Sequence, residues 1–152
     1  MPIKRPNRPN TVSKKAIEKR ELCSAKEMTI VFSFRHLSSN RLYNFRYFDK
    51  MKKHAETTNA IVQLVEKISE MSKMTWEEFN QKAKGSGLEY IDVASFEKQF
   101  TNSVDIPLPK DDKLIVVRFN SQRSRLIIKR GTKCPRVAHV LGIDYDLITY
   151  KH

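Results

Sequence analysis

The sequence has few of the residues that build disulfide-rich, metal or glycine-loop sites. It contains only two cysteines, Cys23 and Cys134, and four glycines among 152 residues. The cysteines form no C-x-x-C motif, so we expect no metal site, and we favour reduced thiols, as in a cytoplasmic protein, over a disulfide between arm and sheet. The glycines form no phosphate-binding loop, so we expect no nucleotide cofactor. No apolar run approaches the length of a membrane-spanning helix, and we expect no membrane partner.

Acidic residues are absent between Lys113 and Ile143, and basic residues are frequent there. The eight basic residues of this stretch are Lys113, Arg118, Arg123, Arg125, Lys129, Arg130, Lys133 and Arg136. Residues 1–26 form a second basic block with eight basic and two acidic side chains, among them Lys4, Arg5, Arg8, Lys14 and Lys15. Three prolines within residues 1–12 oppose a helix. We therefore expect a flexible basic arm over 1–26 and a single domain over 27–152.

Alternating and helical hydrophobic patterns predict an α+β fold. Residues 29–34 and 41–48 resemble the two strands of a hairpin. Ile61, Leu64, Val65, Ile68 and Met71 form one helical stripe, and Thr75 with Glu78 matches a capping box for a second helix. Residues 96–100 can continue as a short third helix, and strands are expected at 113–119, 124–130, 136–143 and 146–150. The predicted fold is an antiparallel sheet, made of the N-terminal hairpin and a C-terminal meander, packed against a helical hairpin.

The basic residues of the meander are candidates for contacts to a polyanion. If Arg118 shares a face with Arg125 and Lys129, a cationic stripe crosses two strands, and Arg123 and Arg130 extend it at the turns. The alternative is a solvated outer face that keeps the sheet soluble. RNA is favoured over DNA as the partner because no helix-turn-helix pattern is present.

Two side chains are candidates for proton transfer. His139 lies within the apolar strand 137–141, where it either acts as a general acid or base or forms a hydrogen bond within the sheet. Tyr150 either contributes a phenolic proton or belongs to the core. His36 and His54 belong to no recognisable motif. Asp144 and Asp146 have the spacing of a turn rather than of a magnesium site.

A helical hairpin followed by a basic meander with Arg118, Arg125, Lys129, His139 and Tyr150 resembles the RelE/ParE-type toxin group. The RelE-like toxins are small cationic endoribonucleases that cut mRNA without metal. The resemblance covers residues 55–152 and implies that Arg118 and Arg125 bind phosphate and that His139 or Tyr150 moves protons. The segment from Val140 to Tyr150 is also similar to the last strand of small proteins of mobile elements, which implies a context but no activity.

Two functions therefore remain open. The first is a small RNA-binding protein, with or without mRNA cleavage as in a toxin–antitoxin pair. The second is a non-catalytic interaction protein, connected with a mobile element or with defence, whose cationic face binds an acidic protein such as an antitoxin. The sequence does not decide whether the protein is an enzyme.

Overall fold

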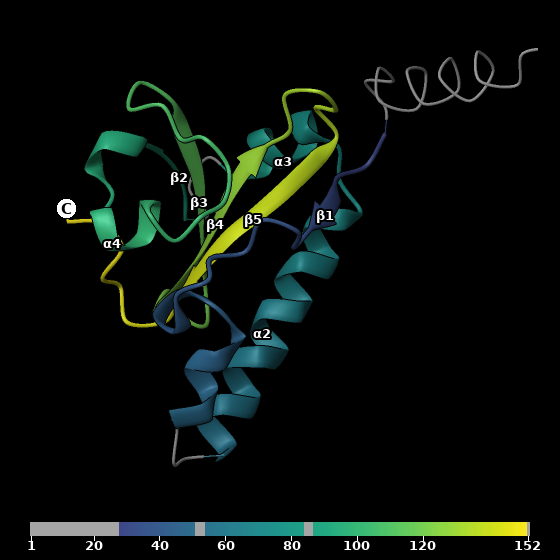
Figure 1. The fold of residues 1–152 in the computed structure, drawn as a ribbon. Helices are drawn as coiled ribbons and strands as arrows, with labels where there is room; N and C mark the ends of the chain where they lie inside the picture. The colour runs from purple at the N-terminus through teal and green to yellow at the C-terminus, as the bar shows by residue number, and fades with distance from the viewer. Residues whose placement is uncertain (1–27, 51–53, 84–86, 152) are drawn as a thin grey trace, which may run out of the picture.

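A computed structural model describes residues 28–50, 54–83 and 87–151, and the predicted arm 1–26 lies outside them (Figure 1). In chain order, the strands are β1 (Val31–Ser33), β2 (Leu88–Asp92), β3 (Lys113–Phe119), β4 (Ser124–Arg130) and β5 (Val137–Asp144). The α-helices are α2 (His54–Ser72), α3 (Trp76–Ala83) and α4 (Lys98–Thr101). Short 3-10 helices are η1 (Arg41–Tyr43), η2 (Phe45–Lys50) and η3 (Val93–Ser95). Among the described residues, no helix is both long and apolar enough to cross a membrane.

The five strands form one mixed sheet in the order β1-β5-β4-β3-β2. The pairs β2–β3, β3–β4 and β4–β5 are antiparallel, and only the short edge strand β1 pairs in parallel, with β5. The α+β class and the mostly antiparallel sheet are therefore confirmed. The predicted bounds of β3 and β4 match the structure residue for residue.

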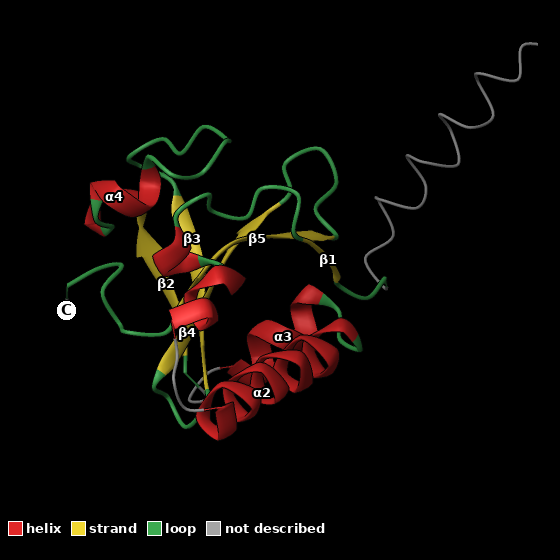
Figure 2. Cartoon of the chain, turned by 60° about the horizontal axis from the view of Figure 1, so that its bottom comes forward, coloured by secondary structure: helices red, strands yellow, loops and turns green. Residues whose placement is uncertain are grey.

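Apolar side chains cover both faces of the sheet, because β3, β4 and β5 alternate between two apolar clusters. On one face α2 and α3 pack through Leu64, Met71 and Phe79 onto the strands. The opposite face is covered by α4, by η1 and by the segments around them, through Tyr43, Phe100 and neighbouring residues. Figure 2 shows α2 and α3 together on one side of the strands, with α4 apart from them.

The predicted N-terminal hairpin does not form, since residues 41–43 and 45–50 are 3-10 helical. Two asparagines explain this. The side chain of Asn40 accepts a hydrogen bond from the amide of Leu42 at 3.0 Å, and Asn44 accepts from the amide of Arg46 at 2.9 Å. Such local bonds give the backbone an alternative to strand pairing. The segment wraps from one sheet face to the other, with Tyr43 in one cluster and Tyr47 against the other.

The helices form largely as predicted, but the stripe of α2 is rotated. Leu64 and Met71 are buried, whereas Val65 is 58% exposed and Ala60 joins the core instead. The capping box is confirmed, because Thr75 accepts from the amide of Glu78 at 3.2 Å and Glu78 accepts from the amide of Thr75 at 2.8 Å. These reciprocal bonds satisfy two amides that the start of α3 leaves free.

Three further differences from the sequence expectations concern residues 146–150, the strand β2 and Cys134. Residues 146–150 form no strand, although Tyr150 makes an isolated bridge with Phe96. The strand β2 was not predicted, and its signal, the alternation of residues 88–92, is weak because three of the five are charged or phenolic. Cys134 is disulfide-bonded, so the expected reduced state is wrong for this residue.

Candidate nucleic-acid interface

The acid-free run does not form a one-signed surface in the folded chain, because acids from other segments meet its cations. Lys113 lies 3.7 Å from Asp92, Arg118 lies 2.7 Å from Glu89, Arg125 lies 3.6 Å from Asp144, and Lys129 lies 2.5 Å from Asp112. Arg130 and Arg136 donate to the backbone carbonyls of Pro135 and Thr29. Arg123 and Lys133 are exposed, but they lie in turns at opposite ends of β4.

Arg118 and Arg125 are directly opposite each other on β3 and β4, as the predicted stripe requires. Their environment differs from the prediction. Arg125 is 2% exposed and Asp144 is 0% exposed, so this pair belongs to the interior of the protein. Arg118 and Glu89 extend the charged row to β2 and are partly exposed. Arg125 therefore does not lie on a surface that a nucleic acid backbone can contact.

Tyr150 closes over this charged row and is itself 3% exposed. Its ring lies 4.1 Å from the guanidinium carbon of Arg125, a cation–π contact, and its hydroxyl donates to Glu89 at 2.9 Å. Burial, followed by the hydrogen bond to Glu89, raises the pKa of Tyr150 to about 12. The phenol thus stays protonated at neutral pH and holds the segment after β5 on the sheet.

His139 lies beside a histidine that the sequence did not connect with it. The rings of His36 and His139 contact edge to face at 5.1 Å, and Nδ1 of His36 lies 2.8 Å from a carboxylate oxygen of Asp105. Lys129 is the partner of His139 on β4. Nδ1 of His139 is buried and has no hydrogen-bond partner among the described residues. This histidine pair, with Asp105 orienting one ring, is an arrangement that can move protons.

Next to His36, the chain presents aromatic rings and arginines to solvent. Phe34 is 39% exposed and Phe45 is 45% exposed, and their ring centroids are 5.9 Å apart. Arg35 and Arg46 follow these rings directly in the sequence and are exposed. We call Phe34, Arg35, Phe45 and Arg46 the aromatic–cationic face. Among the described residues neither arginine forms an ion pair, so both guanidinium groups are available to an anion.

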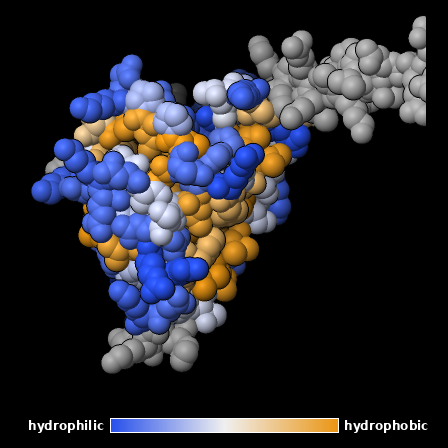
Figure 3. All heavy atoms as spheres, viewed as in Figure 1, coloured by the Kyte–Doolittle hydropathy of each residue, from blue (hydrophilic) through white to orange (hydrophobic). Residues whose placement is uncertain are grey.

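The fold holds this face in place through the turn between β1 and η1. The amide of Ser38 donates to the carbonyl of Leu141 on β5 at 2.8 Å, and the amide of Ser39 donates to the carbonyl of Ser103 at 2.9 Å. Asn44 donates its side-chain amide to the carbonyl of Ser38. Figure 1 shows the segment after β1 returning along β5 to short helices beside α2, and Figure 3 shows apolar side chains at the surface between hydrophilic ones.

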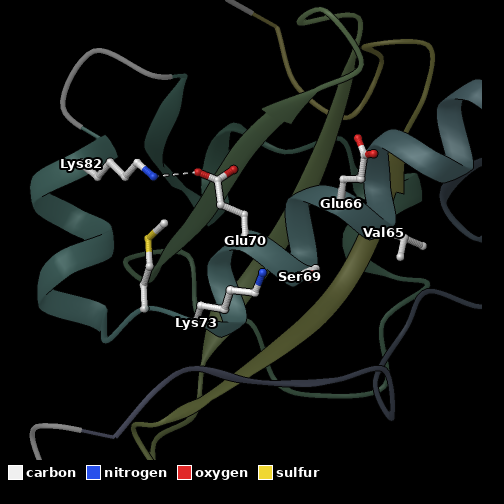
Figure 4. Close-up of a pocket in the computed structure, with 7 residues that line it drawn as sticks. Val65, Glu66, Ser69, Glu70, Lys73 and Lys82 are labelled. Carbon is white, nitrogen blue, oxygen red and sulfur yellow. Dashed lines mark hydrogen bonds and ion pairs between the residues drawn. The ribbon is translucent and has the colours of Figure 1, made fainter.

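A hollow of about 530 Å³ between α2 and α3 offers no comparable charge (Figure 4). Glu66 and Glu70 balance Lys73 and Lys82 along its walls. Lys82 lies 3.0 Å from Glu70, and Lys67 lies 3.6 Å from the same carboxylate. These ion pairs lower the pKa of Glu70, the hydrogen bond from Lys82 being the largest cause. The hollow therefore has neither the exposed rings of the aromatic–cationic face nor arginines that lack an ion pair among the described residues.

Metal binding finds no support in the described residues, where no three His, Cys, Asp or Glu side chains are arranged to hold an ion. Asp144 instead organises a turn. One of its oxygens accepts from the amide of Ile148, and the other accepts from the amide and the hydroxyl of Thr149.

The predicted phosphate contacts of Lys4, Arg5, Arg8, Lys14 and Lys15 lie outside the described residues.

Sequence reasoning missed the aromatic–cationic face because residues 41–48 were interpreted as a strand. A signal was present, since residues 34–47 contain four aromatic side chains and three arginines but no acid. Comparisons of the chain with models of protein families, with curated proteins and with solved structures found no match.

The buried position of Arg125 yields a first prediction. Arg125→Ala leaves the carboxylate of Asp144 without its buried cation, and we expect a loss of about 3–5 kcal/mol in the free energy of unfolding. Arg123→Ala, two residues earlier and exposed, should change stability by less than about 0.5 kcal/mol. Urea unfolding followed by circular dichroism measures both, and an equal, small effect for the two variants would contradict the buried pair.

The environment of His139 yields a second prediction. Burial, and then the positive charges of His36 and Arg35, lower the pKa of His139 below its ordinary 6.5. The unfolded chain therefore binds more protons at this residue than the native chain, and stability should decrease as the pH falls below about 6.5. The variant His139→Gln should lack the part of this pH-dependent loss of stability that comes from His139.

The measurement is urea unfolding of both proteins at a series of pH values. Asn102→Ala, an exposed substitution without a titrating group, serves as the control and should follow the wild-type pH dependence. Parallel curves for wild type and His139→Gln would show that His139 titrates alike in the folded and unfolded chains.

Proposed function

We propose that this chain binds single-stranded nucleic acid, RNA in preference to DNA, through the aromatic–cationic face. The observation that carries the proposal is the exposed pair Phe34 and Phe45 with Arg35 and Arg46 beside the rings. Bases stack on exposed aromatic rings, and guanidinium groups bind the phosphates between them. Residues 29–48 contain no acidic side chain, and both charged side chains of the face are arginines, although Asp105 lies beside the face on His36.

The structure changes which cations support this function. The sequence argument relied on Arg118, Arg125 and Lys129, and each of these has a carboxylate partner in the fold. Arg35 and Arg46, which were not among the predicted contacts, have none among the described residues. The formal net charge of +12 remains a reason for long-range attraction of a polyanion.

Binding of fluorescently labelled single-stranded RNA of mixed sequence tests the proposal. Phe45→Ala removes a stacking ring and should weaken binding by about 1–3 kcal/mol. Arg35→Gln should weaken all sequences alike and reduce by about 1 the slope of log K against log salt. Fluorescence anisotropy at increasing salt measures both quantities.

Matched controls lie elsewhere on the molecule. Tyr90 is 48% exposed on the edge strand β2, at the edge of the sheet opposite to β1, so Tyr90→Ala removes an equally exposed ring. Arg123→Gln removes an exposed cation in the β3–β4 turn. If the controls weaken binding as much as Phe45→Ala and Arg35→Gln, or if salt has no effect, the face is not the site. Tight binding of one acidic protein without RNA binding would favour an antitoxin-like partner instead.

Metal-independent cleavage of the bound RNA is a second candidate, favoured by the histidine pair. His36, oriented by Asp105, is two residues after Phe34 in the sequence, and its ring contacts His139, the strand partner of Ser33. One imidazole would take the proton of the ribose 2′-hydroxyl while its oxygen attacks phosphorus, and the other would protonate the departing 5′-oxygen. This is the chemistry that the RelE-type resemblance implies, carried by His36 rather than by the buried Tyr150.

Cleavage is tested by incubating RNA with the protein in excess chelator and separating the products on a gel. We expect fragments that end in a cyclic phosphate and that disappear with His139→Gln and with His36→Gln. Lys98→Gln, an exposed substitution on α4, should leave cleavage unchanged. If the RNA stays intact in the presence of saturating protein, the protein binds RNA but does not cleave it.

A further inference from the structure

A pocket of about 280 Å³ opens where η1 and η2 meet the turn after β5. It is lined by Arg41, Leu42, Arg46, Tyr47, Lys50 and Asp146. Three of these six residues are cations and one is an acid, so the lining has a formal charge of +2 at neutral pH. Its volume is just below the range for drug-sized ligands, about 300–1,000 Å³, and suits a single phosphate with its sugar.

The cations of the pocket are carried by backbone whose shape is fixed. Asn40 caps η1 and Asn44 caps η2 with side-chain hydrogen bonds, and Tyr43 between them is 1% exposed. The ring of Tyr43 packs edge to face on Phe100 at 5.3 Å. This anchor sets the positions from which Arg41 and Arg46 project, so part of the ordering cost of binding is already met by folding.

Asp146, the acid in the lining, accepts a hydrogen bond from a neutral side chain. The hydroxyl of Tyr47 donates to Asp146 at 2.5 Å, and the ring of Tyr47 stacks on Tyr145 at 4.8 Å with 22° between the planes. Burial, followed by the hydrogen bond to Asp146, raises the pKa of Tyr47 to about 12, so the phenol keeps its proton. Among the described residues, Arg41, Arg46 and Lys50 form no ion pair. The positive charge of the pocket is thus not neutralised within the described chain.

This combination is selective for one class of anion. Two guanidinium groups and an ammonium match a doubly charged phosphate monoester better than the single charge of a phosphodiester. The ring of Tyr47 and the side chain of Leu42 supply an apolar wall for a ribose or a base. Arg46 belongs both to the pocket and to the aromatic–cationic face, so the pocket continues that face.

We propose that this pocket binds a phosphate monoester, namely the terminal phosphate of the RNA strand whose bases stack on Phe34 and Phe45. The inference rests on the proposed RNA binding and adds an end preference to it. A free nucleoside monophosphate offers the same chemistry, and the experiment separates the two sources.

The test compares oligoribonucleotides of one sequence with a 5′-phosphate, with a 3′-phosphate and with hydroxyls at both ends. We expect one phosphorylated end to bind at least five-fold more tightly than the hydroxyl form. Arg41→Gln should abolish this preference and leave the affinity of the hydroxyl form nearly unchanged. Asp146→Asn keeps an acceptor for Tyr47 and removes a negative charge, so the preference should increase. Arg123→Gln is the matched control and should leave the preference intact.

The outcomes separate the pocket from the face. Equal affinity of the three oligonucleotides overturns the pocket while the proposed RNA binding stands. Failure of every oligonucleotide to bind removes the strand-end assignment together with the proposed function. Binding of adenosine monophosphate alone, measured by calorimetry and lost with Arg41→Gln, supports the monoester site with the free nucleotide as its source. A decrease of the preference with Asp146→Asn would contradict an anion site.

Discussion

The fold depends on a charge placed inside the sheet. Arg125 lies on the central strand β4, is 2% exposed, and has Asp144 of β5 as its strand partner. A buried guanidinium without a carboxylate is strongly destabilising, so this position requires the neighbouring strand to supply an acid. Asp144 also binds the amides of residues 148 and 149, which turns the following segment back so that Tyr150 covers the arginine. The interior ion pair of Arg125 and Asp144 thus positions the segment that covers this face of the sheet.

Charge in the sequence and charge on the surface differ in this protein for the same reason. No acid lies between the eight basic residues from 113 to 136 along the chain, but the fold brings Glu89, Asp92, Asp112 and Asp144 beside four of them. Several exposed arginines without an ion pair among the described residues lie close together in residues 35–46, where the number of cations is smaller. For a ligand the pairing of charges after folding matters more than their count.

Sequence patterns predicted those structural features that depend on residues close together in the chain. The alternation of residues 113–130 gave the bounds of two strands, and Thr75 with Glu78 gave the start of α3. Tertiary partners were beyond such patterns. Nothing local distinguishes an arginine that faces water from Arg125, and nothing local connects His36 with Asp105, which is 69 positions away. The strand predicted over residues 41–48 does not form, because the local hydrogen bonds of Asn40 and Asn44 outweigh the strand preference of the aromatic residues in this segment.

The order of residues along the chain also determines when the protein can fold during its synthesis. Arg125 is synthesised before Asp144, and Asp144 before the turn and the tyrosine that enclose the pair. A nascent chain that has emerged only as far as β4 can assemble the β3–β4 hairpin, but the guanidinium of Arg125 then lacks the carboxylate of Asp144. The parallel pairing of β1 with β5 adds a contact between segments about a hundred residues apart, and such contacts form slowly. Stable folding therefore waits for the last strand, and a ribosome that stalls before residue 144 leaves an incomplete sheet exposed to proteases and chaperones.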